Sequence, residues 1–339
     1  MTEENKTYRR PVMPLIGSSF KPGNAHKVVS QIEDEKLAVI ARAELRYFCG
    51  ETKDCAALVE PYLEDKDVSL RLSANMLYIF SNLMLGSPMK AQTSRQHIRD
   101  CLEIALCTNE TDEIKAECVF ASYLSTVLLH ISPEGLPEIK DYIRYLPVGQ
   151  RLYAVYLSAH NAYLKKEYEV AIGMVESALM MMDEVYPIAM IYLYCIMAVC
   201  QMNLKNTEGA QATFMKAFSM ARPDKFIEPF IEHHGLLQGL VESCIRKTEP
   251  QLYKRISDQI IAFSRGWMKI HNPEAQKNVT SLLTPLEFSI AMLACRDWTN
   301  QEIADYLELS VNTVKHYISV ILEKLGVDKR EKLREYVNQ

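Results

Sequence analysis

Residues 299–327 read TNQEIADYLELSVNTVKHYISVILEKLGV and predict two helices separated by a tight turn. Thr299 and Glu302 have the spacing of a capping box at the start of the first helix. Ser310 is placed to cap the start of the second helix with its hydroxyl oxygen. Gly326 stands just past the second helix, where a left-handed residue commonly ends one. These signals, in this order, predict a helix-turn-helix unit.

Two further helices are expected around this unit. Thr284 and Glu287 form another capping box, and Pro285 lies in the first turn, where a proline is tolerated. Asp328 with Glu331 repeats the arrangement near the end of the chain. We therefore expect residues 280–339 to form a four-helix domain.

The helix after Ser310 has two contrasting faces. One apolar stripe follows helical spacing and predicts packing against the preceding helix, through Val314, Ile318, Ile321 and Leu325. The other face is polar in the N-terminal half, the half that reaches base edges when such a helix enters the major groove. Lysine and asparagine side chains can pair with guanine and adenine edges. The candidate base-contacting residues are Asn312, Lys315, His316 and Ser319.

Residues 283–330 resemble the LuxR-type helix-turn-helix, the DNA-binding module of many bacterial transcription regulators. The matching positions run in register without a gap from Leu283 to Arg330. The resemblance implies binding to double-stranded DNA. Residues near helix starts or flanking the groove are expected at phosphates, namely Thr299, Asn300, Thr313 and Lys324. It also implies a homodimer paired through the last helix, over Arg330–Val337, with Leu333, Tyr336 and Val337 as the apolar contact.

Some positions depart from the family pattern and lower its positive charge. Tyr317 replaces the usual histidine, and Asp297 stands where glycine is common. Residues 281–339 contain seven Lys and Arg against nine Asp and Glu, a net charge of −2. DNA-binding domains usually show a basic footprint. We therefore expect modest affinity for each monomer and binding by two subunits.

Residues 28–275 predict a succession of paired amphipathic helices. Short polar turns recur near Gly50, Gly86, Gly135, Lys165 and Lys205. We expect small or apolar residues just inside each second helix, at separations typical of helix-pair repeats, namely Ala56, Ala91, Leu136, Ala171 and Ala210. The unit from Tyr153 to Leu179 resembles a tetratricopeptide repeat. The sequence thus predicts an all-α protein in which a tetratricopeptide-like superhelix precedes the helix-turn-helix domain. Its concave surface is suited to peptides, partner proteins or small ligands.

Residues 216–237 resemble the segment that ends the helical-repeat sensor domain of MalT-like regulators in the LuxR class. A closing helix near Gln251–His271 and a linker at Asn272–Thr280 would follow. MalT-like regulators also carry a phosphate-binding loop, but the stretch from Gly17 to Gly23 has the wrong spacing and order for one. We therefore expect no ATP-dependent step. Residues 1–27 are expected to form a solvated, extended N-terminal arm.

Three features of the body have structural explanations that we prefer to functional ones. The apolar run from Ile188 to Cys200 is too short to span a bilayer and predicts a buried helix. His233 and His234 follow Glu232, but adjacent helical side chains diverge, which favours a loop or capping role over a metal site. The tyrosines are expected to pack within the repeats rather than to line an effector pocket, and they are Tyr153, Tyr156, Tyr163, Tyr168, Tyr186, Tyr192 and Tyr194.

Composition limits the remaining function classes. Hydrophobic residues make up 48% of the 339 residues, with only 12 glycines, which favours a well-packed helical protein. The nine cysteines show no CxxC pair, and no signal peptide precedes them, which indicates a reduced, cytoplasmic protein. No nucleophile elbow, metal quartet or paired carboxylates indicate catalysis. We expect no enzyme activity, cofactor, metal or membrane contact.

The leading hypothesis is a cytoplasmic bacterial transcription regulator that binds operator DNA as a dimer. A small-molecule or protein effector on the helical repeats would control it. The alternative is a helical-repeat scaffold whose terminal helices serve a protein partner and no longer bind DNA. A DNA-binding module like that of sigma factors is a minor third possibility, which the pattern around Thr313–Lys315 disfavours.

Overall fold

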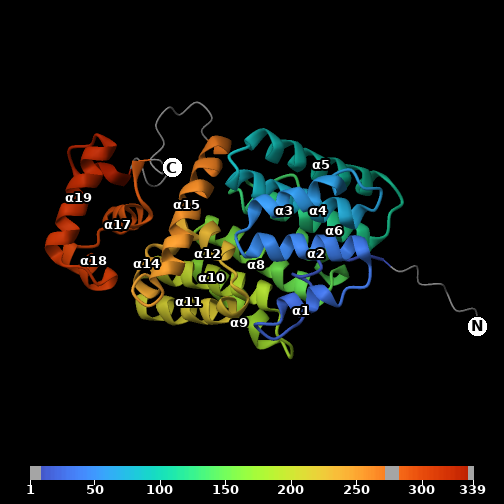
Figure 1. Ribbon diagram of the computed structural model, residues 1–339, viewed down its shortest axis with the longest axis horizontal. Helices are drawn as coiled ribbons and strands as arrows, with labels where there is room; N and C mark the ends of the chain where they lie inside the picture. The colour runs from blue at the N-terminus through green and yellow to red at the C-terminus, as the bar shows by residue number, and fades with distance from the viewer. Residues whose placement is uncertain (1–8, 272–281, 335–339) are drawn as a thin grey trace, which may run out of the picture.

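The computed structural model describes residues 9–271 and 282–334. All the regular elements within these ranges are α- or 3-10 helices, which confirms the all-α prediction. Figure 1 shows a helical body, coloured blue to orange, with the C-terminal helices in red against its far end. The expected linker at Asn272–Thr280 lies outside the described residues.

The body is a series of helix pairs. Within each pair the two helices contact one another, and the first helices of successive pairs are also in contact. The pairs are α2 (Glu35–Phe48) with α3 (Thr52–Val59), α4 (Val68–Met84) with α5 (Pro88–Cys107), α6 (Asp112–Val127) with the short α7 (Ile139–Tyr142), α8 (Val148–Leu164) with α9 (Tyr168–Met180), and α10 (Pro187–Asn203) with α11 (Thr207–Ala221).

The turns of these pairs repeat one backbone motif. After each first helix a residue adopts positive φ, between 52° and 74°, and its amide donates to the carbonyl three residues earlier. The next amide donates five residues back, which completes a Schellman cap. The residues with positive φ are Gly50, Gly86, His130, Lys166 and Lys205. The shared motif shows that the pairs are structural repeats.

The third pair departs from the prediction. Its cap lies at His130, and residues 131–138 then form a loop before the one-turn α7. Leu136 therefore lies in this loop and not inside a second helix, so that expectation is wrong. The four predicted alanines are buried inside the second helices of the other pairs, at Ala56, Ala91, Ala171 and Ala210.

Helix α10 is the buried centre of the body. All residues from Ile188 to Cys200 are buried except Tyr194, which confirms the predicted core helix. Its Tyr192 packs edge-on against Tyr156 of α8, with ring centroids 5.1 Å apart. No helix within the described ranges is long and apolar enough to cross a membrane.

The end of the body folds back over the first two helix pairs, against α2 and α4. After η3 (Arg222–Asp224), the short helices α12 (Glu228–Glu232), α13 (His234–Leu237) and α14 (Leu240–Cys244) lead to α15 (Pro250–His271). The long α15 matches the predicted closing helix. A Cβ on Gly266 would lie only 1.8 Å from the Leu83 carbonyl oxygen, so α15 crosses α4 at a point where glycine is required.

His233 and His234 are buried, which the sequence did not indicate. His233 lies between α12 and α13, as a loop or capping position would, but its ring accepts or donates a hydrogen bond at 2.9 Å to the Tyr156 hydroxyl. Burial lowers the pKa of His233 to about 4, so the ring is neutral near pH 7. His234 Nε2 lies 2.8 Å from Glu242. Both rings therefore belong to the polar interior of the body.

The N-terminal segment is the main correction to the sequence analysis. Residues 9–20 were expected to be solvated, but Val12, Leu15 and Ile16 are at most 1% exposed. They pack inside the body because their apolar side chains are removed from water there. Helix α1 (Ala25–Ser30) then covers the outside of α2. The expected boundary at residue 28 thus falls within a helix.

Candidate nucleic-acid interface

Three helices build the C-terminal module, and their ends form as predicted. They are α17 (Pro285–Cys295), α18 (Asn300–Leu307) and α19 (Val311–Leu325). Both Thr-x-x-Glu capping boxes are present, at the starts of α17 and α18. The Ser310 hydroxyl accepts from the Thr313 amide at 3.0 Å, and Gly326 ends α19 with φ of 66°. These local signals fix the lengths and orientations of the helices.

The predicted cap for a fourth helix is not formed. The Asp328 carboxylate pairs with Lys332 at 2.6 Å, and the 3-10 helix η4 (Arg330–Lys332) begins after Lys329 without a side-chain cap. Residues 333 and 334 are helical, and the chain beyond them lies outside the described part.

Helix α19 separates its two faces as expected. Val314 and Ile321 are fully buried, and Ile318 and Leu325 are at most 9% exposed. This stripe faces Ile303, Ala304 and Leu307 of α18, which are also buried. Because one face is fixed by this packing, the opposite face is held in a defined orientation.

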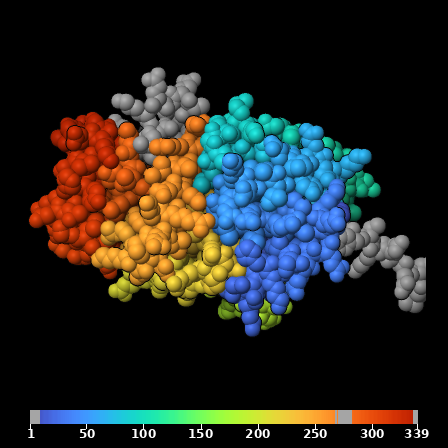
Figure 2. Space-filling view, in the orientation of Figure 1, coloured from blue at the N-terminus to red at the C-terminus, as the bar shows by residue number. Residues whose placement is uncertain are grey.

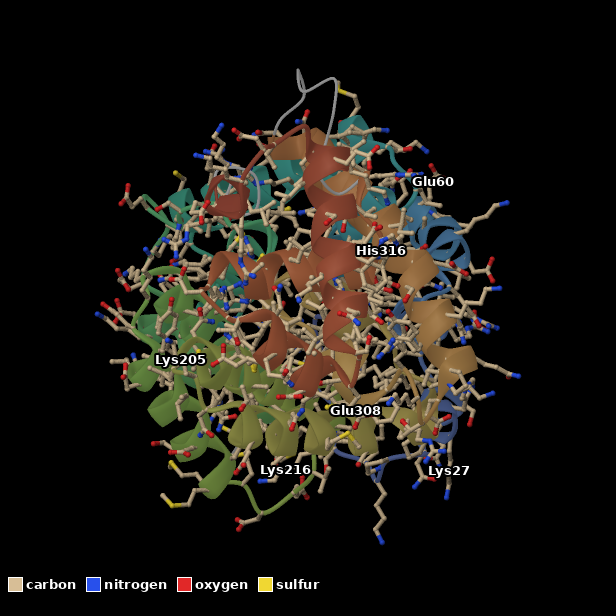
Figure 3. All side chains as sticks on the ribbon, turned by 90° about the vertical axis from the view of Figure 1, so that its left-hand side faces the viewer. Lys27, Glu60, Lys205, Lys216, Glu308 and His316 are labelled. Atoms are coloured by element: carbon tan, nitrogen blue, oxygen red, sulfur yellow. The ribbon has the colours of Figure 1, made fainter. Side chains whose placement is uncertain are left out.

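The four candidate base-contacting residues lie on that opposite face and are all exposed, namely Asn312, Lys315, His316 and Ser319. Within the described residues, the side chains of Asn312 and Lys315 make no hydrogen bond or ion pair. Ser319 donates to the Lys315 carbonyl at 3.1 Å, inside the helix. Figure 3 shows α19 crossing the surface that faces the viewer, with His316 upon it. The polar face of α19 is therefore open to a large partner.

The four candidate phosphate-contacting residues differ in how they are engaged. Thr299 caps α18, and Thr313 shares a hydrogen bond of 2.8 Å with Ser310. Asn300 accepts from Arg330 at 2.7 Å. The Lys324 ammonium lies 2.7 Å from the Glu287 carboxylate. Burial raises the pKa of Glu287, but the hydrogen bonds from Lys324 and the Thr284 amide have the larger combined effect, so this pKa is lowered. Lys324 is thus the one whose charge is already paired.

The proposed dimer residues are only partly within the described chain. Leu333 is fully buried in its own module, beside α17, so it is not exposed in this arrangement. Tyr336 and Val337 lie outside the described residues.

Arg330 and Asp297 have structural roles that the sequence did not reveal. The Arg330 guanidinium donates to the Trp298 carbonyl and to Asn300, and so ties η4 to the loop before α18. Asp297 has φ of 65°, the conformation for which glycine is favoured, and its carboxylate pairs with Arg334 at 2.5 Å. Asp297 therefore adopts the left-handed backbone conformation that glycine commonly adopts at this position.

The module contacts the body through the end of α18 and the turn after it, and also through α17, whose Phe288 ring lies 6.3 Å from that of His234. Arg246 donates to the Leu307 carbonyl at 2.7 Å, and Lys247 pairs with Glu308 at 2.7 Å. The Tyr306 hydroxyl donates to the sulfur of Met202 in α10 at 3.7 Å. Figure 2 shows this contact as red against orange surface. No local pattern predicts this contact, because the residues that form it lie far apart along the chain.

The comparisons with known proteins agree with this geometry. Residues 281–337 match the model of a family described as bacterial regulatory proteins, luxR family. The response regulator protein VraR of Staphylococcus aureus (strain Mu3) is 32% identical over 151 residues, covering 40% of this chain and 70% of VraR. The chain belongs to the LuxR family of bacterial regulatory proteins.

Other relatives are much longer than this chain, which spans less than a fifth of their length. The HTH-type transcriptional regulator MalT of Klebsiella pneumoniae (strain 342) is 26% identical over 146 residues. The matched region covers 38% of this chain but only 16% of MalT. MalT of Cronobacter sakazakii is 25% identical over 153 residues, which is 17% of its length. No solved structure matches the chain.

Proposed function

We propose that this LuxR-family regulator acts in the cytoplasm, binds double-stranded operator DNA with α19 in the major groove and is not an enzyme. The observation that carries the proposal is the polar outer face of α19, which is exposed while the opposite face is buried. Asn312, Lys315, His316 and Ser319 read base edges in this arrangement, each good contact contributing about 1–3 kcal/mol of discrimination.

Phosphate contacts fix the register of the module on DNA. Thr299, Asn300 and Thr313 lie at the starts of α18 and α19, where the helix dipole attracts phosphate without a net positive charge. The amides of Thr299 and Thr313 already donate to Glu302 and Ser310, so the uncapped amides of the first turns are the ones available to phosphate. Lys324 contributes only if DNA competes with Glu287 for its ammonium group. This arrangement gives modest affinity to one subunit.

Two subunits then supply the affinity that one lacks. We propose pairing through the C-terminal segment that carries Tyr336 and Val337, with Leu333 anchoring that segment to α17. A two-fold pair of modules predicts a pseudo-palindromic operator with half-sites about one helical turn apart.

Control is proposed to act on the contact between the turn at Glu308 and the body. Arg246 and Lys247 hold this turn in the arrangement described here. An effector or partner on the helical repeats changes DNA binding only if it binds one arrangement of module and body more tightly than another.

The test is selection of bound sequences from random duplex DNA by the full chain, followed by binding titrations. We expect a two-fold motif, and Lys315→Ala is expected to weaken binding to it by a factor of roughly 5 to 150. Lys53→Ala, which removes the same charge from an exposed position on α3, serves as the control. A selection that yields no common motif from the folded protein contradicts the proposal.

A further inference from the structure

Residues 9–20 cross the first helices of four successive pairs. Their contacts come from side chains that lie far apart in sequence and meet only around this segment. Arg9 forms an ion pair with Glu117 of α6 at 2.5 Å. The amides of Met13 and Leu15 donate to Ser73 of α4 at 2.9 Å and to Glu44 of α2 at 2.8 Å, respectively. The side chain of Gln150 in α8 donates to the Val12 carbonyl.

The body holds this segment chiefly by its main chain. The two carboxylate oxygens of Glu44 accept from consecutive amides, those of Leu15 and Ile16, at 2.8 and 3.1 Å. Glu44 is fully buried. The centre of the segment is a turn, in which Met13 has φ of 48° and its carbonyl accepts from the Gly17 amide at 3.1 Å. Side chains that bind the main chain of a segment, with pockets for its apolar residues, are a means of binding a peptide. A strand or helix of the core would instead satisfy its backbone within its own ladder.

The chemistry of the segment is matched along its length. Its arginines meet carboxylates, with Arg10 at 2.7 Å from Asp34 and 2.8 Å from Asp67. Its branched apolar residues follow and are buried. The site therefore fits a ligand with a cationic pair followed by branched apolar side chains.

Gly149 in α8 allows the segment to approach closely. A Cβ there would lie 2.5 Å from the Ile16 carbonyl oxygen and 2.9 Å from the Gly17 backbone. Gly149 is the second residue of α8, in its first turn. Its presence at this point of α8 is explained by contact with the segment.

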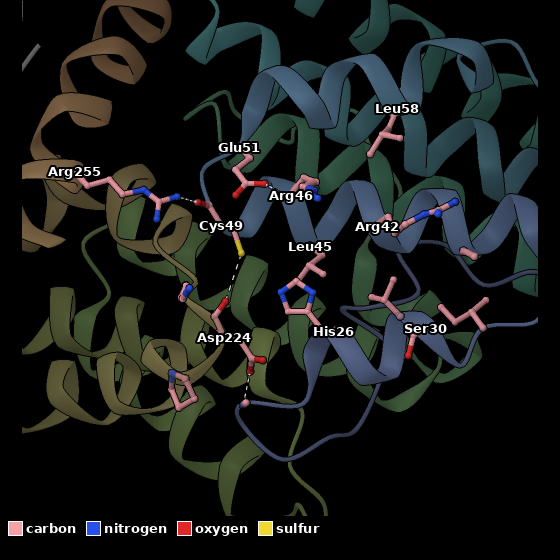
Figure 4. A pocket seen from close by; sticks show the side chains of 16 residues that line it. His26, Ser30, Arg42, Leu45, Arg46, Cys49, Glu51, Leu58, Asp224 and Arg255 are labelled. Carbon is pink, nitrogen blue, oxygen red and sulfur yellow. Dashed lines mark hydrogen bonds and ion pairs between the residues drawn. The ribbon is translucent and has the colours of Figure 1, made fainter.

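A separate anchor follows the segment. The Gly23 and Ala25 amides donate to the Asp224 carboxylate, at 2.6 and 2.9 Å. Asp224 lines a cleft of about 950 Å³. Figure 4 shows Asp224 next to His26 of α1. This anchor holds α1 in place independently of the contacts made by residues 9–20.

We propose that the face formed by α2, α4, α6 and α8 is a binding site for a peptide that adopts a turn, occupied here by the chain's own residues 9–20. A peptide with an arginine pair followed by branched apolar residues competes for this site. The inference goes beyond DNA binding and does not depend on it.

The test uses a labelled peptide of residues 9–20 and the full chain carrying Leu15→Asp and Ile16→Asp, which weakens the internal ligand and leaves its site intact. We expect this variant to bind the peptide at least about tenfold more tightly than the unaltered chain, in which the site is filled. Adding Gly149→Ala is expected to weaken that binding by at least about tenfold because its Cβ meets the ligand backbone. Gly173→Ala on α9, where a Cβ meets nothing within 4 Å, is the matched control.

A second form of the protein covers the case in which the aspartates prevent folding. A protease site placed between Lys21 and Pro22 of the otherwise unaltered chain allows the segment to be cut after folding. We expect the labelled peptide to replace the cut segment in the folded protein. Three results overturn the proposal: a folded variant that binds no peptide, binding that Gly149→Ala leaves unchanged, or a cut protein that unfolds as the segment leaves.

Discussion

The outer face of α19 and the inner face of the helical body present polar side chains in opposite states. On α19, Asn312 and Lys315 have no partner among the described residues and are exposed to water. Inside the body, Glu44 and Ser73 each bind the main chain of residues 9–20. The difference distinguishes a surface that is open to a ligand from one that the chain fills itself. Substitutions on the first are expected to change binding, and those on the second to change stability.

The largest expected effect is on the filled face. Ile16→Asp places a carboxylate where the side chain is 1% exposed, and we expect a loss of roughly 3–5 kcal/mol in the free energy of unfolding. Urea unfolding measures the change. Ser19→Asp, in the same segment but exposed, is expected to stay within about 0.5 kcal/mol of the unaltered chain. Equal effects of the two changes would remove the distinction between the faces.

The next largest expected effect is on the pH dependence of stability, and it comes from the buried carboxyl group of Glu228. Within the described residues neither oxygen of Glu228 has a hydrogen-bond partner, although the side chain is fully buried. Burial raises its pKa well above the ordinary value, and the neighbouring Glu232 adds to the rise. Tyr47 of α2 and Cys55 of α3 also face this pair.

The sign of the pH dependence follows from that raised pKa. The folded protein keeps the Glu228 proton after the unfolded chain has lost it, so stability falls as pH rises above about 4.5, by up to about 1.4 kcal/mol per pH unit. Glu228→Gln is expected to reduce this slope between pH 5 and 8. The exposed Glu113→Gln is the control, and the raised pKa is contradicted if both variants keep the full slope in urea unfolding.

The open face is expected to respond in binding alone. Lys315→Ala removes about 1–3 kcal/mol of binding free energy for the preferred DNA sequence. Its free energy of unfolding is expected to change by less than about 0.5 kcal/mol because the side chain is exposed. Fluorescence anisotropy and urea unfolding measure the two quantities on one sample. A loss of stability as large as the loss of affinity would argue against a free binding surface.

The smallest effect concerns the contact between the module and the body. Lys247 and Glu308 are both more than half exposed, so their ion pair contributes at most about 1 kcal/mol. Lys247→Glu is expected to speed hydrogen exchange at residues 305–310, and adding Glu308→Lys to restore protection. If the second change gives no recovery, the ion pair does not hold the turn.

The sequence predicted local structure well where the signal is contained in neighbouring residues. The capping boxes at Thr284 and Thr299 and the stripe from Val314 to Leu325 depend on spacings of three and four, and all are present. The same holds for the repeated helix pairs, whose turns carry glycine or a polar residue. Asp328 shows the limit, because an ion pair with Lys332 displaced the expected cap.

Contacts between distant segments could not be predicted in this way. Residues 9–20 contain prolines and two arginines, a composition typical of a solvated arm, yet carboxylates of three different helices neutralise the arginines or cap the amides. The contact of Arg246 with Leu307 likewise joins residues that no local pattern relates. The polar face of α19 that we propose binds DNA could be predicted from the residues of one helix. The contact between its module and the body could not.

The central claim is that the free face of α19 reads DNA in the cell. The most direct measurement is genome-wide capture of bound DNA from the native host, comparing the unaltered protein with Lys315→Ala at equal expression. We predict discrete sites that share a two-fold motif and disappear in the variant. The claim is contradicted by sites that persist unchanged in Lys315→Ala. It is equally contradicted by an expressed, folded protein that enriches no DNA, which would favour a helical-repeat scaffold.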